Sequence, residues 1–197
     1  MNIGIVSYGL CTPETFETAA DLAARTGLTL EEVRELGIER KCRPSREDQP
    51  VTMAVKAANQ ALERAGDLSP EDVDLVIWTG EEYKDYIAQT ASIRLQEETG
   101  CKNAWAFDLV GQNVTSIQGL KVARDFILGD ETIHTVLLAG GTRNVDLVDP
   151  ANPDTRFLLA SSASGGAMIL RRNHSQNRLI QTAFTIDYDM ADEVFVP

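Results

Sequence analysis

The sequence predicts an α/β protein in which a five-stranded, mostly parallel sheet carries helices on both faces. Apolar segments of strand length alternate with segments of helical periodicity along the 197 residues. Residues 73–78 are almost continuously apolar, which is typical of a strand buried on both faces of a parallel sheet. A second such run at 104–110 leads directly into a helical pattern over 113–128, as in a strand–turn–helix unit.

Helix boundaries follow from local signals. Thr12-Pro13-Glu14 resembles the start of a helix, and Thr29 with Glu32 matches a capping box. The basic stretch 40–47 and most of 142–164 are expected to be loops. In chain order, the expected elements are a strand at 2–9, helices at 15–25, 29–37 and 51–65, a strand at 73–78, a helix at 87–99, a strand at 104–110, a helix at 113–128, strands at 134–139 and 165–170, and a further strand signal at 179–187.

Composition excludes several classes of protein. An apolar content of 43% and a charged content of 24% describe a globular domain, and no apolar run approaches the roughly 20 residues that cross a bilayer. The net charge of −12 argues against binding to nucleic acid, whose phosphates would be repelled. The three cysteines are scattered without metal or disulfide spacing, which favours a reducing compartment. We therefore expect a cytoplasmic protein with no membrane and no nucleic-acid partner.

The turn between the strand at 104–110 and the following helix is the strongest candidate for a functional site. Backbone N–H groups and the helix dipole converge at such a turn, which suits a nucleophile or an oxyanion. The residue there is Asn113, which is neither.

Four stretches, in this order, resemble the N-terminal half of a thiolase-fold condensing enzyme. The similarity is to β-ketoacyl-acyl-carrier-protein synthase III, with hydroxymethylglutaryl-CoA synthase a more distant relative. The resemblance implies a thiolase-like domain at 1–172 and the beginning of a second half, otherwise missing, at 173–197. The stretches are Leu36-Gly-Ile-Glu-Arg-Lys41, Ala57 to Gly66 with Ser69-Pro-Glu-Asp-Val-Asp-Leu-Val76, Ala106-Phe-Asp-Leu109, and Ser164-Gly-Gly-Ala-Met-Ile-Leu170.

The resemblance also implies that the usual nucleophile is missing. In this family a cysteine five residues after the aspartate of the Ala-Phe-Asp strand attacks the acyl thioester, and counting from Asp108 gives Asn113. A carboxamide cannot form the acyl-enzyme. Asn113 is either a helix N-cap or an amide that donates a hydrogen bond to a substrate carbonyl. Related ketosynthases with glutamine at this position decarboxylate malonyl units without condensing them.

Substrate-binding positions also depart from the family. The tryptophan and arginine that contact coenzyme A align with Glu31 and Glu35, which should weaken phosphate binding. Arg40, Lys41 and Arg43 are candidate replacements, although a basic cluster is often a solvated surface. Tyr86 aligns with an aromatic residue that reaches across the family's dimer, or it simply packs locally.

Three functions follow as hypotheses. The first is the N-terminal half of a 3-oxoacyl-acyl-carrier-protein synthase III-like acyltransferase of fatty-acid or polyketide-type metabolism, unable to form the acyl-cysteine. Its substrate would be acyl-CoA or an acyl-carrier protein, with no other cofactor and no metal. The alternatives are a non-catalytic partner subunit of a condensing enzyme, and a malonyl decarboxylase that uses the amide of Asn113. We expect either a homodimer through strand 104–110 or a heteromer with a second thiolase-fold chain.

Overall fold

One mixed sheet forms the centre of the protein. The structure is a computed structural model that describes residues 1–190. Its five-stranded sheet has the order β1-β7-β6-β4-β5, in which β4 pairs in parallel with β5 and β6, whereas β7 is antiparallel to β6 and β1. All strands of this sheet except β7 therefore run in one direction, as expected for a mostly parallel sheet. The strands are β1 (Ile3–Cys11), β4 (Leu75–Trp78), β5 (Trp105–Asp108), β6 (Thr135–Thr142) and β7 (Ser164–Arg172).

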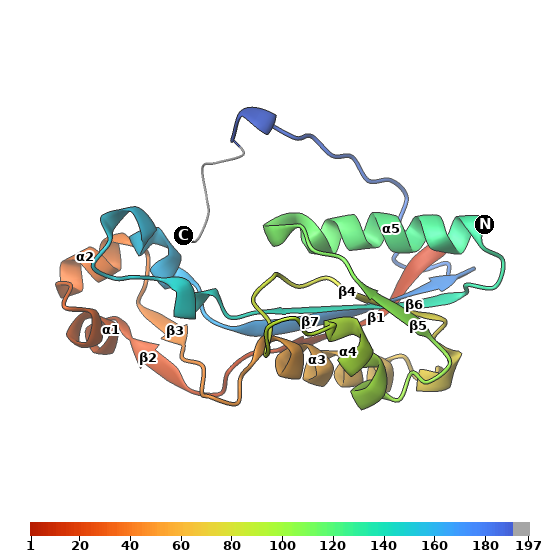
Figure 1. The fold of residues 1–197 in the computed structure, drawn as a ribbon, viewed down its shortest axis with the longest axis horizontal. Coiled ribbons are helices and arrows are strands. Elements are labelled where there is room, and N and C mark those ends of the chain that lie inside the picture. Colours follow the sequence, from red (N-terminus) through yellow and green to blue (C-terminus); the bar gives the residue numbers. More distant parts are fainter. Residues whose placement is uncertain (191–197) are drawn as a thin grey trace.

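Helices cover both faces of this sheet, which confirms the predicted α/β architecture (Figure 1). Helices α3 (Pro50–Arg64) and α4 (Ala91–Thr99) pack on one face, and α5 (Thr115–Gly129) packs on the other. The predicted inward face of α3 is buried, because Ala54, Ala58 and Ala61 are fully inaccessible to solvent. These small side chains let α3 approach the sheet so closely that a Cβ on Gly165 would lie 2.3 Å from the backbone of Met53.

A smaller lobe lies beside the sheet and has its own apolar cluster (Figure 1). Strand β2 (Phe16–Thr18) pairs with β3 (Arg40–Cys42), and the helices α1 (Ala19–Thr26) and α2 (Leu30–Glu35) lie between them in the chain. The capping box predicted for α2 is present. The helix expected from residue 15 instead begins at Ala19, because Thr18 and Asp21 form the capping box and the preceding residues pair with β3. The expected loop at 40–47 likewise begins as a strand.

Short 3-10 helices occupy several connections. The segment 142–164, expected to be mostly loop, holds η3 (Asn144–Leu147) and η4 (Pro153–Ala160), and Leu159 of η4 packs into the smaller lobe. The others are η1 (Pro70–Asp72), η2 (Gln112–Val114) and η5 (Tyr188–Met190).

The strand predicted at 179–187 does not form. The backbone N–H groups of Asn173 and Leu179 donate to Asn2 and Ile3 at the start of β1, with N···O distances of 2.7 and 2.9 Å, and Arg178 makes a single bridge to Gly4. Beyond Leu179 the segment leaves the sheet, so its apolar residues, such as Ile180 and Ile186, are exposed (Figure 1). The division of the chain at residue 172 remains a prediction, and residues 191–197 lie outside the described range. Among the described helices, none has the length and apolar character needed to cross a membrane.

Candidate functional site

The turn between β5 and α5 is closed by its own hydrogen bonds. The N–H of Gly111 donates to Oγ1 of Thr115 at 2.8 Å, and that hydroxyl donates to the carbonyl of Gln112 at 2.6 Å. Thr115 is buried, whereas Gln112 has a φ of +57°, a conformation that costs a residue other than glycine about 1 kcal/mol or more. The sequence therefore builds a constrained turn at the start of α5.

Asn113 lies within this turn, in η2, and its side chain is exposed. The prediction that it caps the helix is wrong, because α5 begins at Thr115, its N-cap is Val114, and no side chain caps it. In the part of the chain that the structure describes, the Asn113 amide makes no hydrogen bond to another protein group. No hydrogen bond within the described chain fixes the orientation of this amide, so it is available to bind a ligand.

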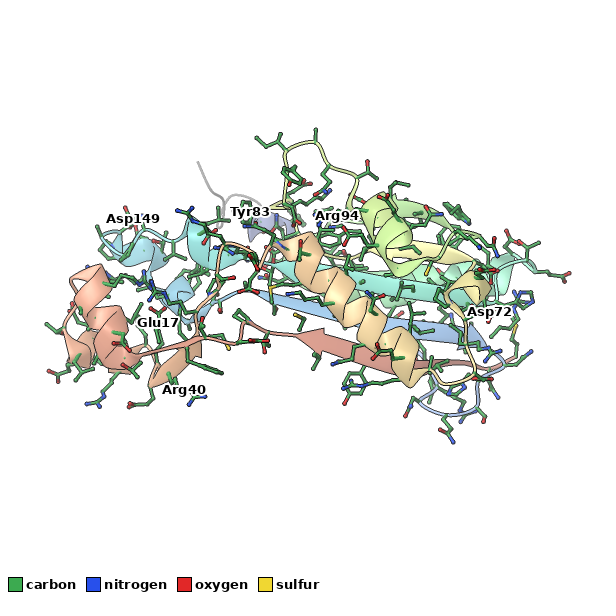
Figure 2. The ribbon with its side chains drawn as sticks, turned by 90° about the horizontal axis from the view of Figure 1, so that it is seen from below. Glu17, Arg40, Asp72, Tyr83, Arg94 and Asp149 are labelled. Atoms are coloured by element: carbon green, nitrogen blue, oxygen red, sulfur yellow. The ribbon has the colours of Figure 1, made fainter. Side chains whose placement is uncertain are left out.

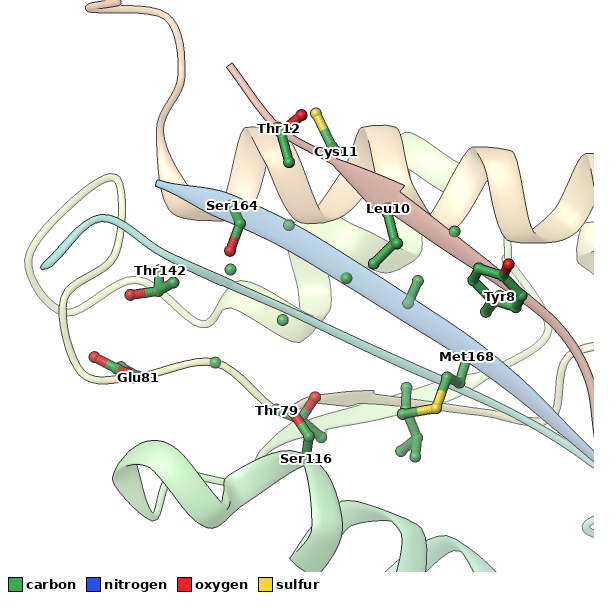
Figure 3. Close-up of a pocket in the computed structure, with 18 of the residues that line it drawn as sticks. Tyr8, Leu10, Cys11, Thr12, Thr79, Glu81, Ser116, Thr142, Ser164 and Met168 are labelled. Atoms are coloured by element: carbon green, nitrogen blue, oxygen red, sulfur yellow. The ribbon is translucent and has the colours of Figure 1, made fainter. Parts of the chain in front are cut away.

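Two cavities meet at Asn113. The larger has a volume of about 520 Å³ and is bounded by β1, β6, β7 and the start of α5 (Figure 3). One end of it is apolar, with Tyr8, Leu10 and Met168, and the other end is polar, with Thr12, Glu81 and Thr142. The second cavity, of about 400 Å³, shares Asn113, Glu81 and Thr142 and continues toward Lys41 and Asn144. A ligand bound at Asn113 thus has an apolar space on one side and a polar space on the other.

Asp108, at the end of β5, holds the surrounding backbone in place. Its carboxylate accepts hydrogen bonds from the N–H groups of Ala91 and Ser92, at 3.1 and 2.9 Å, and from Nζ of Lys84 at 2.6 Å. Burial alone would raise the pKa of Asp108, but the hydrogen bonds from Lys84, Ser92 and Ala91 outweigh it and lower the pKa below its usual value of 3.8. The helix predicted from residue 87 begins at Ala91 because Asp108 satisfies its first N–H groups.

A second aspartate holds the same loop from the other side. The carboxylate of Asp85 accepts hydrogen bonds from the N–H of Val51 at 2.7 Å and from Oγ1 of Thr52 at 3.0 Å. It also forms an ion pair with Arg94 (Figure 2). Between these two anchors the loop exposes Tyr86, whose side chain is 71% accessible, and Ile87. Tyr86 lines neither cavity, so its predicted role in contacting a neighbouring subunit's substrate remains a prediction.

Arg40, Lys41 and Arg43, the candidates for phosphate binding, lie in three different environments. The guanidinium of Arg40 stacks over the ring of Phe16, 4.0 Å from its centroid, and Arg43 is exposed. Lys41 is buried, and its amine donates to the carbonyls of Leu159 and Ser161 at 2.5 and 2.7 Å. Of the three, Lys41 lines the smaller cavity with Asn113, but its amine is already bound to these two carbonyls. The proposed phosphate-binding role therefore rests on Arg40 and Arg43.

Sequence reasoning did not identify several residues that line the cavities. Thr12, Glu81, Ser116 and Thr142 surround the space next to Asn113. The sequence could have indicated that Glu81 and Thr142 lie near the site. Glu81 follows β4, Thr142 ends β6, and the carboxyl ends of neighbouring parallel strands meet at one edge of the sheet. The same signal applied to Thr12, which directly follows β1, a strand that runs in the same direction. Ser116 lies in α5 and had no comparable signal.

The described residues contain no cluster of histidine, cysteine or acidic side chains with the geometry of a metal site. Cys11 lines the larger cavity, but burial, together with Asp48 and Glu14, raises the pKa of its thiol, and Lys56 only partly offsets this. A raised pKa leaves little thiolate at neutral pH. Cys11 is therefore a poor replacement for the missing nucleophile.

Comparison with known proteins supports the fold and the family resemblance. A family model described as 3-oxoacyl-[acyl-carrier-protein (ACP)] synthase III matches residues 107–187, which include the turn and β7. The β-ketoacyl-[acyl-carrier-protein] synthase III of Clostridium perfringens is 32% identical over 142 residues, covering 72% of this chain and 43% of the relative. The chain is a synthase III-like thiolase-fold protein.

Other relatives extend the match over most of the chain. A hydroxymethylglutaryl-CoA synthase of Archaeoglobus fulgidus is 26% identical over 187 residues, covering 94% of this chain and 52% of the relative. The crystal structure of the synthase III of Aquifex aeolicus superposes with a TM-score of 0.77 at 25% identity, covering 88% of this chain and 55% of that one. The synthase III-like chain thus spans about half the length of the curated relatives it matches.

Proposed function

We propose that the chain is one half of a synthase III-like protein that binds an acyl thioester, from acyl-CoA or an acyl-carrier protein, without forming an acyl-cysteine. The observation that carries the proposal is Asn113. It lies in a constrained turn just before α5, beside a cavity of about 520 Å³, at the position that the resemblance gives to the nucleophile.

The chemistry of the site supports binding more than covalent catalysis. An amide can donate a hydrogen bond to a thioester carbonyl, but it cannot accept the acyl group as a thiolate does. Cys11, the thiol that shares the larger cavity, has a raised pKa. The role belongs to fatty-acid or polyketide-type metabolism and implies a cytoplasmic location, both by similarity to the relatives.

The test is acylation of the full-length protein. It is incubated with acetyl-CoA, and its intact mass is measured. We expect no acetyl adduct on the wild type and an adduct on the introduced thiol of the Asn113→Cys variant, because the turn would again hold a thiol at a helix N-terminus. A stable acetyl adduct on the wild type would contradict the proposal, and so would a failure of both proteins to bind a non-reactive acetyl-CoA analogue.

An apolar surface on the described chain supports pairing with a second thiolase-type half. The side chains of Ile117 on α5 and of Tyr8 and Leu10 on β1 are 51%, 57% and 63% accessible to solvent. Tyr8 and Leu10 line the larger cavity together with Ser116, the residue before Ile117. Clustered exposed apolar side chains often mark a surface that another chain or segment covers. The covering half is either another part of the same protein or a separate chain, which is the partner-subunit hypothesis. Co-purification of a second thiolase-fold chain in a fixed ratio would favour the separate chain, and a homo-oligomer would exclude it.

A further inference from the structure

Glu81 lines both of the cavities that contain Asn113. Figure 3 shows it at the polar end of the larger one. No other aspartate or glutamate among residues 1–190 lines either of them. A ligand that touches the Asn113 amide is therefore close to this single negative charge.

The backbone around Glu81 is fixed on both sides. The N–H of Thr79 donates to the carbonyl of Ala139 at 2.8 Å, which extends the pairing of β4 and β6 to the residue before Gly80. A Cβ on Gly80 would lie 2.1 Å from the buried ring of Trp78, so the chain can take this path only with glycine. Downstream, the ion pair of Lys84 with Asp108 holds the loop. Glu81 is thus presented to the cavities by a fixed segment.

The cations nearby are bound to other groups. Lys84 pairs with Asp108, and Lys41 donates to the carbonyls of Leu159 and Ser161. Arg143, next to Thr142, donates to Asp146 at 2.6 Å and to the carbonyls of Ser45 and Asp48. Within the described residues Glu81 makes no ion pair and no side-chain hydrogen bond. Its charge in the cavity is therefore not neutralised by protein groups.

We infer that Glu81 makes this site select a neutral acyl group and reject an acyl group that carries a carboxylate, such as malonyl. The inference rests on the proposed function, which it makes more specific. Two carboxylates in a cavity repel each other more strongly than in water, because the effective dielectric constant is lower. The apolar end of the larger cavity, at Tyr8, Leu10 and Met168, suits a neutral chain. This charge argues against the malonyl decarboxylase hypothesis.

The test compares two ligands of the same shape. Isovaleryl and malonyl groups are nearly isosteric, and only malonyl is charged. Each is attached to pantetheine through an amide N–H in place of the thioester sulfur, because the amides are stable and neither reaction nor nucleotide phosphates then affect binding. Titration calorimetry on the full-length protein should show that isovaleryl binds at least about tenfold more tightly than malonyl. In Glu81→Gln, and in Glu81→Ala as a second variant, malonyl binding should tighten until the ratio is below about threefold. The control Glu82→Gln changes an exposed neighbour and should keep the wild-type ratio.

The outcomes separate the two proposals. If neither ligand binds to the wild type, the proposed function fails and the inference fails with it. If isovaleryl binds but the ratio is the same in wild type and both Glu81 variants, the proposed function stands and the inference is wrong. Tighter binding of malonyl than isovaleryl by the wild type would also overturn the inference.

Discussion

Lys84 and Asp108 form an ion pair, with 2.6 Å between Nζ and Oδ2, that joins the loop after β4 to the end of β5. The same carboxylate also accepts the N–H groups of Ala91 and Ser92. One side chain therefore connects a strand, a helix N-terminus and the loop that carries Glu81.

Asp108→Asn should destabilise the protein by about 2–4 kcal/mol, because it leaves the Lys84 amine without its counter-charge and weakens the cap of α4. The free energy of unfolding is measured by urea denaturation. Glu82→Gln, on the same loop but exposed, should change it by less than about 0.5 kcal/mol. Equal stability of Asp108→Asn and wild type would contradict the arrangement of these groups.

The lowered pKa of Asp108 makes this contribution depend on pH. A carboxyl whose pKa is lower in the folded state stabilises the protein above its unfolded pKa, near 3.8, and this stability is lost as the pH falls through the folded pKa. The stability difference between wild type and Asp108→Asn should therefore be full at pH 6 and shrink below about pH 4. Thermal unfolding followed by circular dichroism from about pH 6 to about pH 2.5 measures it. Parallel curves across this range would show that the carboxylate is not responsible.

Gly165→Ala should destabilise the protein by about 3 kcal/mol or more, because the new methyl group would collide with the backbone of Met53. Gly129→Ala is the matched control. A Cβ at Gly129, in the last turn of α5, meets nothing within 4 Å, so this change should be neutral or stabilise by up to about 1 kcal/mol. A melting temperature of Gly165→Ala well below those of wild type and Gly129→Ala would confirm the close contact of α3 and β7, and a neutral Gly165→Ala would refute it.

Lys41→Met should release the segment at 153–161 from the smaller lobe. Its amine is buried and holds the carbonyls of Leu159 and Ser161, while burial lowers its pKa and the nearby carboxylate of Glu17 partly restores it. We expect faster amide hydrogen exchange in this segment and a loss of about 1–3 kcal/mol. Arg43→Met removes an exposed charge and should leave the exchange unchanged, although it should weaken phosphate binding if Arg43 contacts a coenzyme. Identical exchange in Lys41→Met and wild type would exclude the tether.

The proposed dimer through β5 can be tested by placing a charge on this strand and measuring the sedimentation mass. This strand is at the edge of the sheet, and its Trp105 is partly exposed beside Phe107 and Phe126. Ala106→Lys should halve the sedimentation mass of a homodimer, because a charge at the paired edge opposes strand pairing. Far-ultraviolet circular dichroism checks that the variant is folded. An unchanged mass would place the interface elsewhere.

Local signals predicted those elements whose stabilising contacts are local. The capping box of Thr29 and Glu32 is present, and the alanine face of α3 is buried as its spacing indicated. Residues 16–18 were wrongly assigned to a helix, because they pair with β3, which follows only after both helices of the smaller lobe. No local pattern reports such a pairing, and the strong helix signal at Thr12-Pro13-Glu14 was therefore misleading.

The functional site was predictable only in part. The position of the turn at Asn113 followed from the strand and the helix around it, but α5 begins later than expected because Thr115 closes the turn. Glu81 was missed because its importance depends on the two cavities that it lines with Asn113. Its proximity to Asn113 results from the sheet order, in which β4 lies between β5 and β6, and the order of strands is a three-dimensional property.

The reversed strand β7 has a consequence for how the chain is synthesised. In the described sheet, β1 at residues 3–11 is paired with β7 at residues 164–172. The first strand to leave the ribosome therefore has no place in the sheet until nearly all of the remaining described chain has been translated. Until then its backbone groups must remain in water or be bound by a chaperone, and substitutions that slow the arrival of β7 should lower the yield of folded protein more than its final stability.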